Sequence, residues 1–381
     1  MTIYLDNAAT TWPKPESVYL AMDHFARKSM ANPGRSGHAM AKASEKILDD
    51  ARVVLNRFFE GASPDRWAFT LNGTDALNMA IKGVVSPGDH VITTNLEHNS
   101  VNRPLRALEL AGIISVTRVV SDPGGIVDPN QVLAAFTHNT KLVVMTHASN
   151  VLGTVQPIEE VAHLTRNKGA LILVDAAQTA GILPISLSKT PIDLMAFPGH
   201  KGLMGPTGTG NLYVGPRVKI RAWREGGTGG DSKTETQPID FPYFLEGGTP
   251  NIMGIAGLLA GLKWITEKGM ENIHQQENAL AKRLSESIAL LPGIKLLGHQ
   301  DWSKKVATVS FIVEGLEPYE MGNILDSSFA IAVRPGLHCA PNIHRGQDTF
   351  PDGAIRASLG PFNTDEDIDA LITALKEVLG N

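Results

Sequence analysis

The stretch ALILVDAAQTAGILPISLSKTPIDLMAFPGHKG, residues 170–202, decides the fold. It contains two short apolar runs, 170–174 and 194–197, and polar residues or glycines follow each of them. Apolar runs of roughly four to eight residues bounded by turn residues predict strands buried on both faces, as in a parallel sheet. Ligands bind beyond the carboxyl ends of such strands. Asp175 and Lys201, which follow the two runs, are therefore candidates for a functional site.

The same alternation of short apolar runs and helix-length segments extends from about residue 45 to residue 215. Helices are predicted at 76–81, 100–111 and 158–167. We therefore expect an α/β fold with a mostly parallel seven-stranded sheet. The five further predicted strands are WAFTL (67–71), HVITTN (90–95), ISVTRVV (114–120), KLVVMTH (141–147) and GNLYVG (210–215).

The sequence changes in character after residue 250. Thr364 is a plausible N-cap for a closing amphipathic helix. These elements predict a smaller α+β domain, and we place the large domain at 15–260 and the small domain at 1–14 and 261–381. The predicted elements of the C-terminal part are a helix rich in small residues (251–269), a polar helix (270–291), strands at 305–315 and 329–335, and the closing helix (365–379).

Composition limits the class of protein. Of 381 residues, 43% are hydrophobic and 19% charged, as in an ordinary globular protein. The net charge of -5 argues against nucleic acid or an anionic membrane as a partner, because both require clustered Lys and Arg. No apolar run approaches the ~20 residues of a membrane span, and we expect no signal peptide at the start. The single cysteine, Cys339, rules out an internal disulfide and favours a cytoplasmic setting.

Polar residues also follow the other predicted strands. Gly73-Thr74 stands at the start of a helix, where free N–H groups and the helix dipole favour an anion such as a phosphate. A simple N-cap by Thr74 explains the same pair. His98 follows the strand at 90–95, and Asn150 follows the strand at 141–147. All these residues lie at one edge of the sheet and can face one crevice.

Asp175 and Lys201 together point to one cofactor. Asp175 ends an aliphatic strand, where a carboxylate is costly unless it is paired. The pyridinium nitrogen of pyridoxal 5′-phosphate (PLP) is such a partner, and a buried Asp that caps a loop is the alternative. Desolvation after a buried strand gives Lys201 a neutral amine that forms an imine, whereas an exposed loop lysine is the usual alternative. With a phosphate seat and a ring-stacking His98, the set predicts a PLP enzyme.

Motifs spread along the chain resemble the class V aminotransferase family, and most of all its cysteine desulfurases and selenocysteine lyases. The resemblance spans nearly the whole sequence. It implies the architecture of fold-type I PLP-dependent transferases and a homodimer with active sites at the subunit interface. The motifs are TIYLDNAATT, NGTDALN, LEHNS, SNVLGTVQPI, LVDAAQTAG, GHKGLMGPTGTG, EGGTPN, RPGLHCAP and IRASLGPFNT.

The resemblance implies specific roles at the cofactor ring. Lys201 would be the lysine that forms the imine, and His98 would stack on the ring and lie near the substrate Cα as an acid or base. Asp175 would pair with the ring nitrogen, and Gln178 would hydrogen-bond the phenolic oxygen.

The resemblance likewise assigns the phosphate and the substrate. The substrate carboxylate would bind to Arg356 and to Asn150, which also lies beside the cofactor, since a guanidinium suits bidentate binding. Arg334 and His38 would lie near the substrate, and a surface loop position explains His38 equally well. The phosphate ligands would be Thr74 and His200, together with Thr249 from the second subunit, and Gly73 and Asp75 would also belong to the cofactor site.

Cys339 is expected to be the sulfur acceptor. The nucleophile must be a thiolate, which nearby positive charge favours, and Arg334 and His338 are close in sequence. The segment RPGLHC also resembles the subgroup of the family with a shorter cysteine loop. A buried small hydrophobe is the alternative for a lone cysteine. A metal site at His338, Cys339 and His344 is rejected because the spacing lacks the ligand pairs of a structural zinc site.

Three departures from the family pattern concern individual positions. Pro198 stands where the family usually has a phosphate-binding serine, so that contact must be missing or replaced. Leu337 replaces the first of two histidines before the cysteine. The NGTDALN segment is one residue shorter than the version of this loop that has two threonines.

The predicted function is a cysteine desulfurase that converts L-cysteine to L-alanine and transfers the sulfur to Cys339 as a persulfide. The sulfur would supply iron–sulfur cluster assembly or another sulfur-acceptor protein. Selenocysteine lyase, or another class V lyase or aminotransferase, is the alternative within the family. A PLP-binding partner protein without turnover is the alternative from another class.

Overall fold

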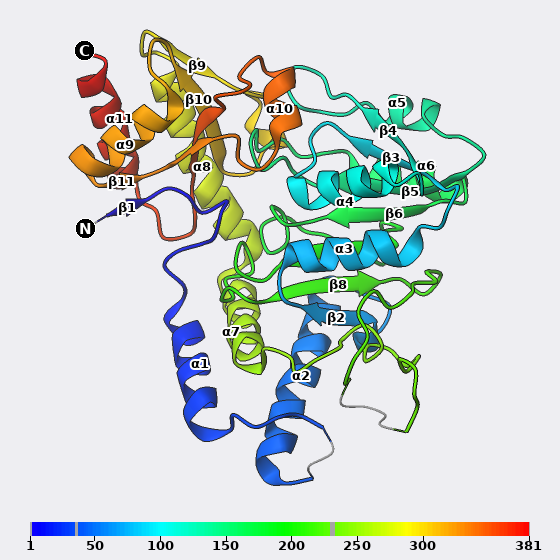
Figure 1. Ribbon diagram of the computed structural model, residues 1–381. Helices are drawn as coiled ribbons and strands as arrows, with labels where there is room; N and C mark the ends of the chain where they lie inside the picture. Colours follow the sequence, from blue (N-terminus) through cyan, green and yellow to red (C-terminus); the bar gives the residue numbers. More distant parts are fainter. Residues whose placement is uncertain (1, 35–36, 229–232, 381) are drawn as a thin grey trace.

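The structure is a computed structural model, which describes residues 2–34, 37–228 and 233–380. Its centre is a seven-stranded sheet with the strand order β2-β8-β7-β6-β5-β3-β4 (Figure 1). The five strands from β7 to β4 are parallel, whereas β8 runs antiparallel to both of its neighbours. The predicted α/β fold with a mostly parallel seven-stranded sheet is confirmed. Its strands are β2 (Trp67–Thr70), β3 (His90–Thr94), β4 (Ser115–Val119), β5 (Thr140–Thr146), β6 (Leu171–Asp175), β7 (Leu194–Pro198) and β8 (Gly210–Val214).

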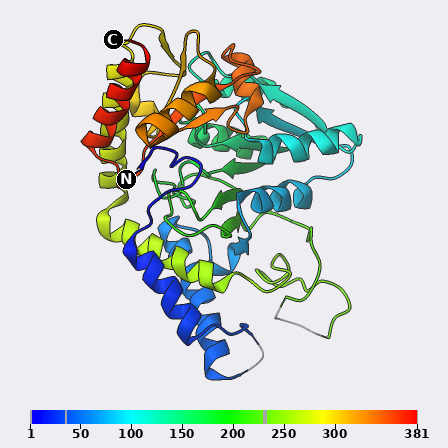
Figure 2. The ribbon, with the colours of Figure 1, turned by 60° about the vertical axis from the view of Figure 1, so that its left-hand side comes forward.

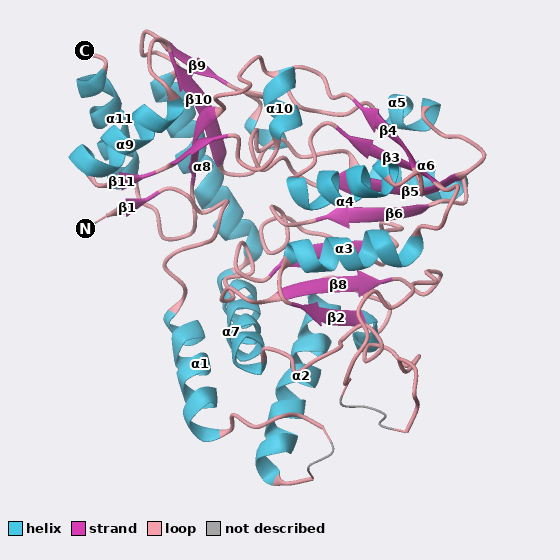
Figure 3. Ribbon diagram, in the orientation of Figure 1, coloured by secondary structure: helices cyan, strands magenta, loops and turns pink. Residues whose placement is uncertain are grey.

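Helices cover both faces of this sheet (Figure 3). Along β6, Leu171 and Leu173 belong to the core with α3 and α4, whereas Ile172 and Val174 belong to the core with α2, α6 and α7. Burial on both faces explains why the strands are almost continuously apolar. The helices of the large sheet are α2 (Ala39–Phe58), α3 (Gly73–Val84), α4 (Asn99–Leu110), α5 (Pro129–Ala134), α6 (Ile158–Asn167) and α7 (Ile252–Lys268).

The C-terminal part forms a second layer of strands and helices beside the large sheet, and both chain ends lie there (Figure 1). Its antiparallel sheet has the order β12-β13-β10-β9, and β1 (Ile3–Tyr4) pairs in parallel with β11 (Ile331–Ala332). Thr364 caps the last helix as predicted, in a reciprocal pair with Asp367. The other elements are α8 (Met270–Ile288), β9 (Ile294–Leu296), β10 (Thr308–Val313), α9 (Pro318–Phe329), β12 (Arg334–Gly336), α10 (Pro341–Gly346), β13 (Ala354–Ser358) and α11 (Asp365–Val378).

Parts of the fold differ from the predictions. The strand predicted at 329–335 is two strands, β11 and β12, which belong to different sheets. The helices α1 (Glu16–Lys28), α2 and α9 were not predicted, and α1 and α2 pack against α7 (Figure 2). The domain boundary near residue 260 stays a prediction, and α7 runs through it. No helix among the described residues combines the length and apolar character needed to cross a membrane.

Candidate active site

A cavity of about 210 Å³ lies where β5, β6 and β7 end and where α3 and α4 begin. Strand ends and helix starts place polar side chains and free N–H groups around one space. The structure brings most of the predicted site residues together here. Those that line the cavity are Gly73, Thr74, His98, Asn150, Asp175, Gln178, His200, Lys201, Arg334 and Arg356.

Asp175 and Lys201 perturb each other across this cavity. Burial raises the pKa of Asp175, while the N–H of Ala177 and the charge of Lys201 oppose the rise. Burial lowers the pKa of Lys201 to about 8, and the charge of Asp175 opposes that shift. The site therefore combines an amine that is largely neutral above pH 8 with a buried carboxyl group that gains from a cationic partner.

His98 is the N-cap of α4 and is held in one tautomer. Its Nδ1 accepts a hydrogen bond from the backbone N–H of Ser100 at 3.0 Å, so the ring proton is assigned to Nε2. Burial lowers the pKa of His98 to about 4, and the charge of Lys201 adds to the shift. His98 is therefore a neutral ring at neutral pH.

Arg356 lines the cavity and is held there by groups from distant parts of the chain. Its Nη2 donates to Asp6 Oδ1 at 2.6 Å, and its Nη1 donates to the carbonyl oxygen of Asn150 at 2.9 Å. The side chain is only 1% exposed, and its Nε finds no hydrogen-bond partner among the described residues. A buried guanidinium with an unused donor is suited to bind a carboxylate.

Cys339 lies on an exposed loop next to this cavity. Arg334 Nη2 is 3.7 Å from Cys339 Sγ, and both Arg334 and His338 line the cavity. His338 and Cys339 have φ angles of 51° and 58°, a left-handed conformation that is costly for residues other than glycine. Asn150 Nδ2 fixes the loop by donating to the carbonyl oxygen of His338 at 2.7 Å. Because Cys339 is exposed, the alternative of a buried small hydrophobe is discarded.

A hydrogen-bonded chain of side chains supports the same loop. His338 Nε2 donates to the carbonyl oxygen of Arg334 at 2.9 Å, so its Nδ1 is an acceptor. That Nδ1 lies 3.4 Å from His344 Nε2, and His344 Nδ1 lies 2.8 Å from the Thr349 hydroxyl. The ring nitrogens of both histidines therefore have hydrogen-bond partners within the protein. Among the residues that the structure describes, no group of side chains is arranged to hold a metal ion.

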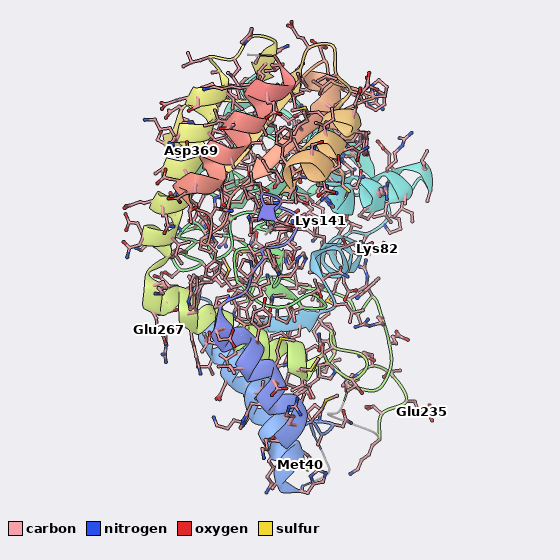
Figure 4. The ribbon with its side chains drawn as sticks, turned by 90° about the vertical axis from the view of Figure 1, so that its left-hand side faces the viewer. Met40, Lys82, Lys141, Glu235, Glu267 and Asp369 are labelled. Atoms are coloured by element: carbon pink, nitrogen blue, oxygen red, sulfur yellow. The ribbon has the colours of Figure 1, made fainter. Side chains whose placement is uncertain are left out.

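Besides Cys339, which lies next to the cavity, three predicted residues lie outside it. The carboxylate of Asp75 accepts the N–H of Leu71 at 2.9 Å and stabilises the start of α3, so we no longer assign Asp75 to the cofactor. His38 caps α2, next to Met40, which lies at the end of the molecule opposite Asp369 (Figure 4). His38 is therefore not part of this cavity. Thr249 is exposed and lines a separate surface hollow.

Comparison with known proteins supports what this geometry indicates. The sequence matches the family described as aminotransferase class-V over residues 3–371. The chain belongs to the class V aminotransferase family. It is 35% identical to a probable cysteine desulfurase of Methanothermobacter thermautotrophicus, with 99% of this chain and 95% of the relative covered. It is 34% identical to a probable cysteine desulfurase of Pyrococcus abyssi, with 99% of this chain and 94% of that relative covered.

Solved structures of class V enzymes resemble this chain over its whole length. The apo structure of a cysteine desulfurase from Thermococcus onnurineus has a TM-score of 0.94 at 32% identity. The match covers 100% of this chain and 95% of the Thermococcus chain. The cysteine desulfurase CsdA from Escherichia coli has a TM-score of 0.89 at 28% identity, with 100% and 95% covered. The fold-type I architecture is thereby shown.

Class V enzymes depend on PLP, and the residues present fit this cofactor. His200 Nδ1 is buried and has no hydrogen-bond partner among the described residues, as expected for a donor that faces an anion. A Cβ at Gly73 would lie 3.1 Å from Pro198 Cδ, so only glycine fits the start of α3 without displacement. Asp175 and Lys201 lie at the ends of the two central strands, as the pyridine ring requires.

The cavity also contains residues that the sequence did not single out. Ser100 lines it from the first turn of α4, and Thr146 lines it from the end of β5. Asp6 reaches it indirectly as the counter-ion of Arg356. The serine two residues after His98 was a detectable signal, because hydroxyl groups in a first helical turn commonly face anions.

Proposed function

We propose that this chain is a PLP-dependent cysteine desulfurase that converts L-cysteine to L-alanine and takes up the sulfur on Cys339. The observation that carries the proposal is the position of Cys339, which is exposed and lies beside Arg334 at the cavity that holds Lys201. A transaminase needs no such cysteine. The names of the relatives support the same activity.

PLP supplies an electron sink for the electron pair released at the substrate Cα. Thr74 and His200 would bind its phosphate, Asp175 its ring nitrogen and Gln178 its phenolic oxygen. The buried Asp175 favours a protonated ring nitrogen, because the positive charge compensates the buried carboxylate.

The protein groups around the substrate then have separate tasks. Arg356 would bind the carboxylate and fix the direction in which the side chain extends. Lys201, with a pKa lowered to about 8, serves as the base that takes the Cα proton. His98 is neutral and leaves the ring face uncharged. Binding of the carboxylate to Arg356 would direct the substrate sulfur to the side of the cavity where Asn150 fixes the Cys339 loop.

Sulfur transfer follows from the position of the thiol. The thiolate of Cys339 attacks the substrate sulfur, the S–S bond forms, and the Cβ–S bond breaks with its electron pair moving onto the substrate. Alanine is complete once Cβ gains a proton and Lys201 returns the proton that it took from Cα. Cys339 then carries the sulfur as a persulfide on an exposed loop, where a thiol reductant or a sulfur-acceptor protein can reach it.

Three further assignments belong to this proposal. A homodimer is supported by Thr249, which is exposed in its own subunit and is available to the phosphate site of a second copy. A chain with one cysteine that cycles through a persulfide is suited to the reducing cytoplasm. The sulfur would serve iron–sulfur cluster assembly or another sulfur carrier.

The test is to incubate the PLP-loaded protein with L-cysteine and measure alanine, sulfide and the intact protein mass. Without reductant, the protein should gain sulfur at Cys339, which is the only cysteine and makes the assignment unambiguous. With reductant, alanine and sulfide should appear in equal amounts, and Cys339→Ala should yield neither. If alanine does not form while PLP is bound, the reaction is not desulfuration. The selenocysteine lyase alternative is tested by assaying L-selenocysteine in parallel and comparing its kcat/KM with that for L-cysteine.

A further inference from the structure

Pro198 leaves the phosphate end of the cavity without the hydroxyl that the family usually supplies there. Proline has neither a side-chain donor nor a backbone N–H, and Pro198 lines the cavity at the end of β7. It also packs against Gly73, at the start of α3. Any replacement for the missing donor must therefore come from another element that borders the same end of the cavity.

Ser100 is positioned to supply that donor. Its hydroxyl oxygen lies 2.6 Å from the hydroxyl oxygen of Thr74, and Ser100 lines the cavity while remaining only 8% exposed. Thr74 belongs to the first turn of α3 and Ser100 to the first turn of α4. The two hydroxyl groups thus form a pair at the point where two helix N-termini, each favourable to an anion, come together.

The hydrogen bonds around this pair leave one proton without a fixed acceptor. The single lone pair of His98 Nδ1 already accepts the backbone N–H of Ser100 at 3.0 Å. The Ser100 hydroxyl, 2.9 Å from the same nitrogen, is therefore not needed to satisfy it. Thr74 and Ser100 have two hydroxyl protons, and the bond between them uses one. The other is available to an anion in the cavity.

We propose that the Ser100 hydroxyl is a ligand of the cofactor phosphate and, with Thr74, replaces the donor that Pro198 lacks. This inference rests on the PLP assignment above and names a further residue of the same site. His200, whose buried Nδ1 has no partner among the described residues, supplies a second side-chain donor at this end.

The test compares PLP with pyridoxal, which has the same ring and aldehyde but no phosphate. Apoprotein is titrated with each compound. The dissociation constant for pyridoxal divided by that for PLP measures how much the phosphate contributes to binding. Because a hydrogen bond to a charged group is involved, Ser100→Ala should reduce this ratio by about 10- to 100-fold. Its dissociation constant for pyridoxal should stay near the wild-type value.

A second variant and a control separate this role from a general loss of stability. Ser100→Gly removes the same hydroxyl and should reduce the ratio equally. Ser285→Ala removes another buried serine hydroxyl, on α8, which donates to Gln300 Oε1, and this variant should leave the ratio unchanged. A wild-type ratio in either folded Ser100 variant overturns the proposal. A wild-type protein that binds neither compound refutes the PLP assignment instead, so the two failures are distinguishable.

Discussion

Replacing Arg356 by lysine should selectively weaken the binding of substrates that have a carboxylate. A guanidinium has five N–H donors in a fixed plane, and two of those of Arg356 are used by Asp6 and by the carbonyl of Asn150. Three remain, including the buried Nε–H. A lysine ammonium has three donors at one point, so keeping Asp6 and Asn150 leaves one for the substrate.

The size of the effect follows from this count. The variant replaces a bidentate contact by a single hydrogen bond to the carboxylate. A hydrogen bond to a charged group contributes about 1.5–3 kcal/mol, so the KM for L-cysteine should rise by roughly 10- to 150-fold. The effect on kcat should be smaller, because Arg356 contacts neither Cα nor the sulfur in the proposed mechanism.

The assay compares L-cysteine with cysteamine, which has the amine and the thiol but no carboxylate. The affinity of each is read from the change in cofactor absorbance on mixing. Arg356→Lys should weaken the binding of L-cysteine and leave the binding of cysteamine unchanged. The matched control is Arg283→Lys, because Arg283 forms an exposed ion pair with Asp365. Equal losses for both compounds would refute the assignment, because the damage would then not depend on the carboxylate.

Four further outcomes are expected. Cys339→Ala should keep wild-type PLP affinity while losing sulfide release by at least ~100-fold, and weak PLP binding would contradict a role confined to sulfur transfer. The rate at which apoprotein binds PLP should rise with pH and level off above pH 8, since burial lowers the pKa of Lys201 to about 8 and only the neutral amine attacks; a rise that continues to pH 10 would contradict this. Gly73→Ala should raise the Kd for PLP several-fold, since its Cβ would lie 3.3 Å from Pro198 N, and an unchanged Kd would count against the tight contact. Burial raises the pKa of Glu277 to about 8, so the folded state retains a proton that the unfolded chain releases, and stability falls as pH rises from about 4.5 to 8. Chemical denaturation should therefore show Glu277→Gln to be more stable than wild type by about 1 kcal/mol or more at pH 8, with the difference vanishing toward pH 4.5.

The sequence predicts the central sheet well because its signal is local. All seven apolar runs became strands, and the residue after each run lies within a few positions of the strand end. The direction of β8 was not predictable in the same way. A buried strand is apolar whether it is parallel or antiparallel, and only its pairing with β7 and β2 decides the direction.

Several contacts at the site depend on chain segments that are far apart. Asp6 and Arg356 are 350 residues apart, and nothing near Asp6 indicates a buried guanidinium. The strand predicted at 329–335 fails for a related reason, since β11 pairs with β1 and β12 pairs with β13. The residues carried over from the family line the cavity where their motifs adjoin strand ends, and their roles stay predictions. Asp75 does not line the cavity, and its carboxylate accepts the N–H of Leu71.

Asn150 gives the site a built-in measure of substrate length. Its backbone carbonyl accepts from Arg356 and its side-chain amide donates to the carbonyl of the residue before Cys339, so one residue spaces the proposed carboxylate anchor from the proposed nucleophile. An amino acid with one extra methylene, such as homocysteine, would carry its sulfur past the thiol while its carboxylate stayed on the same anchor. Selection by length therefore needs no pocket shaped around the sulfur, and a chain with a freely moving cysteine loop would lose this discrimination.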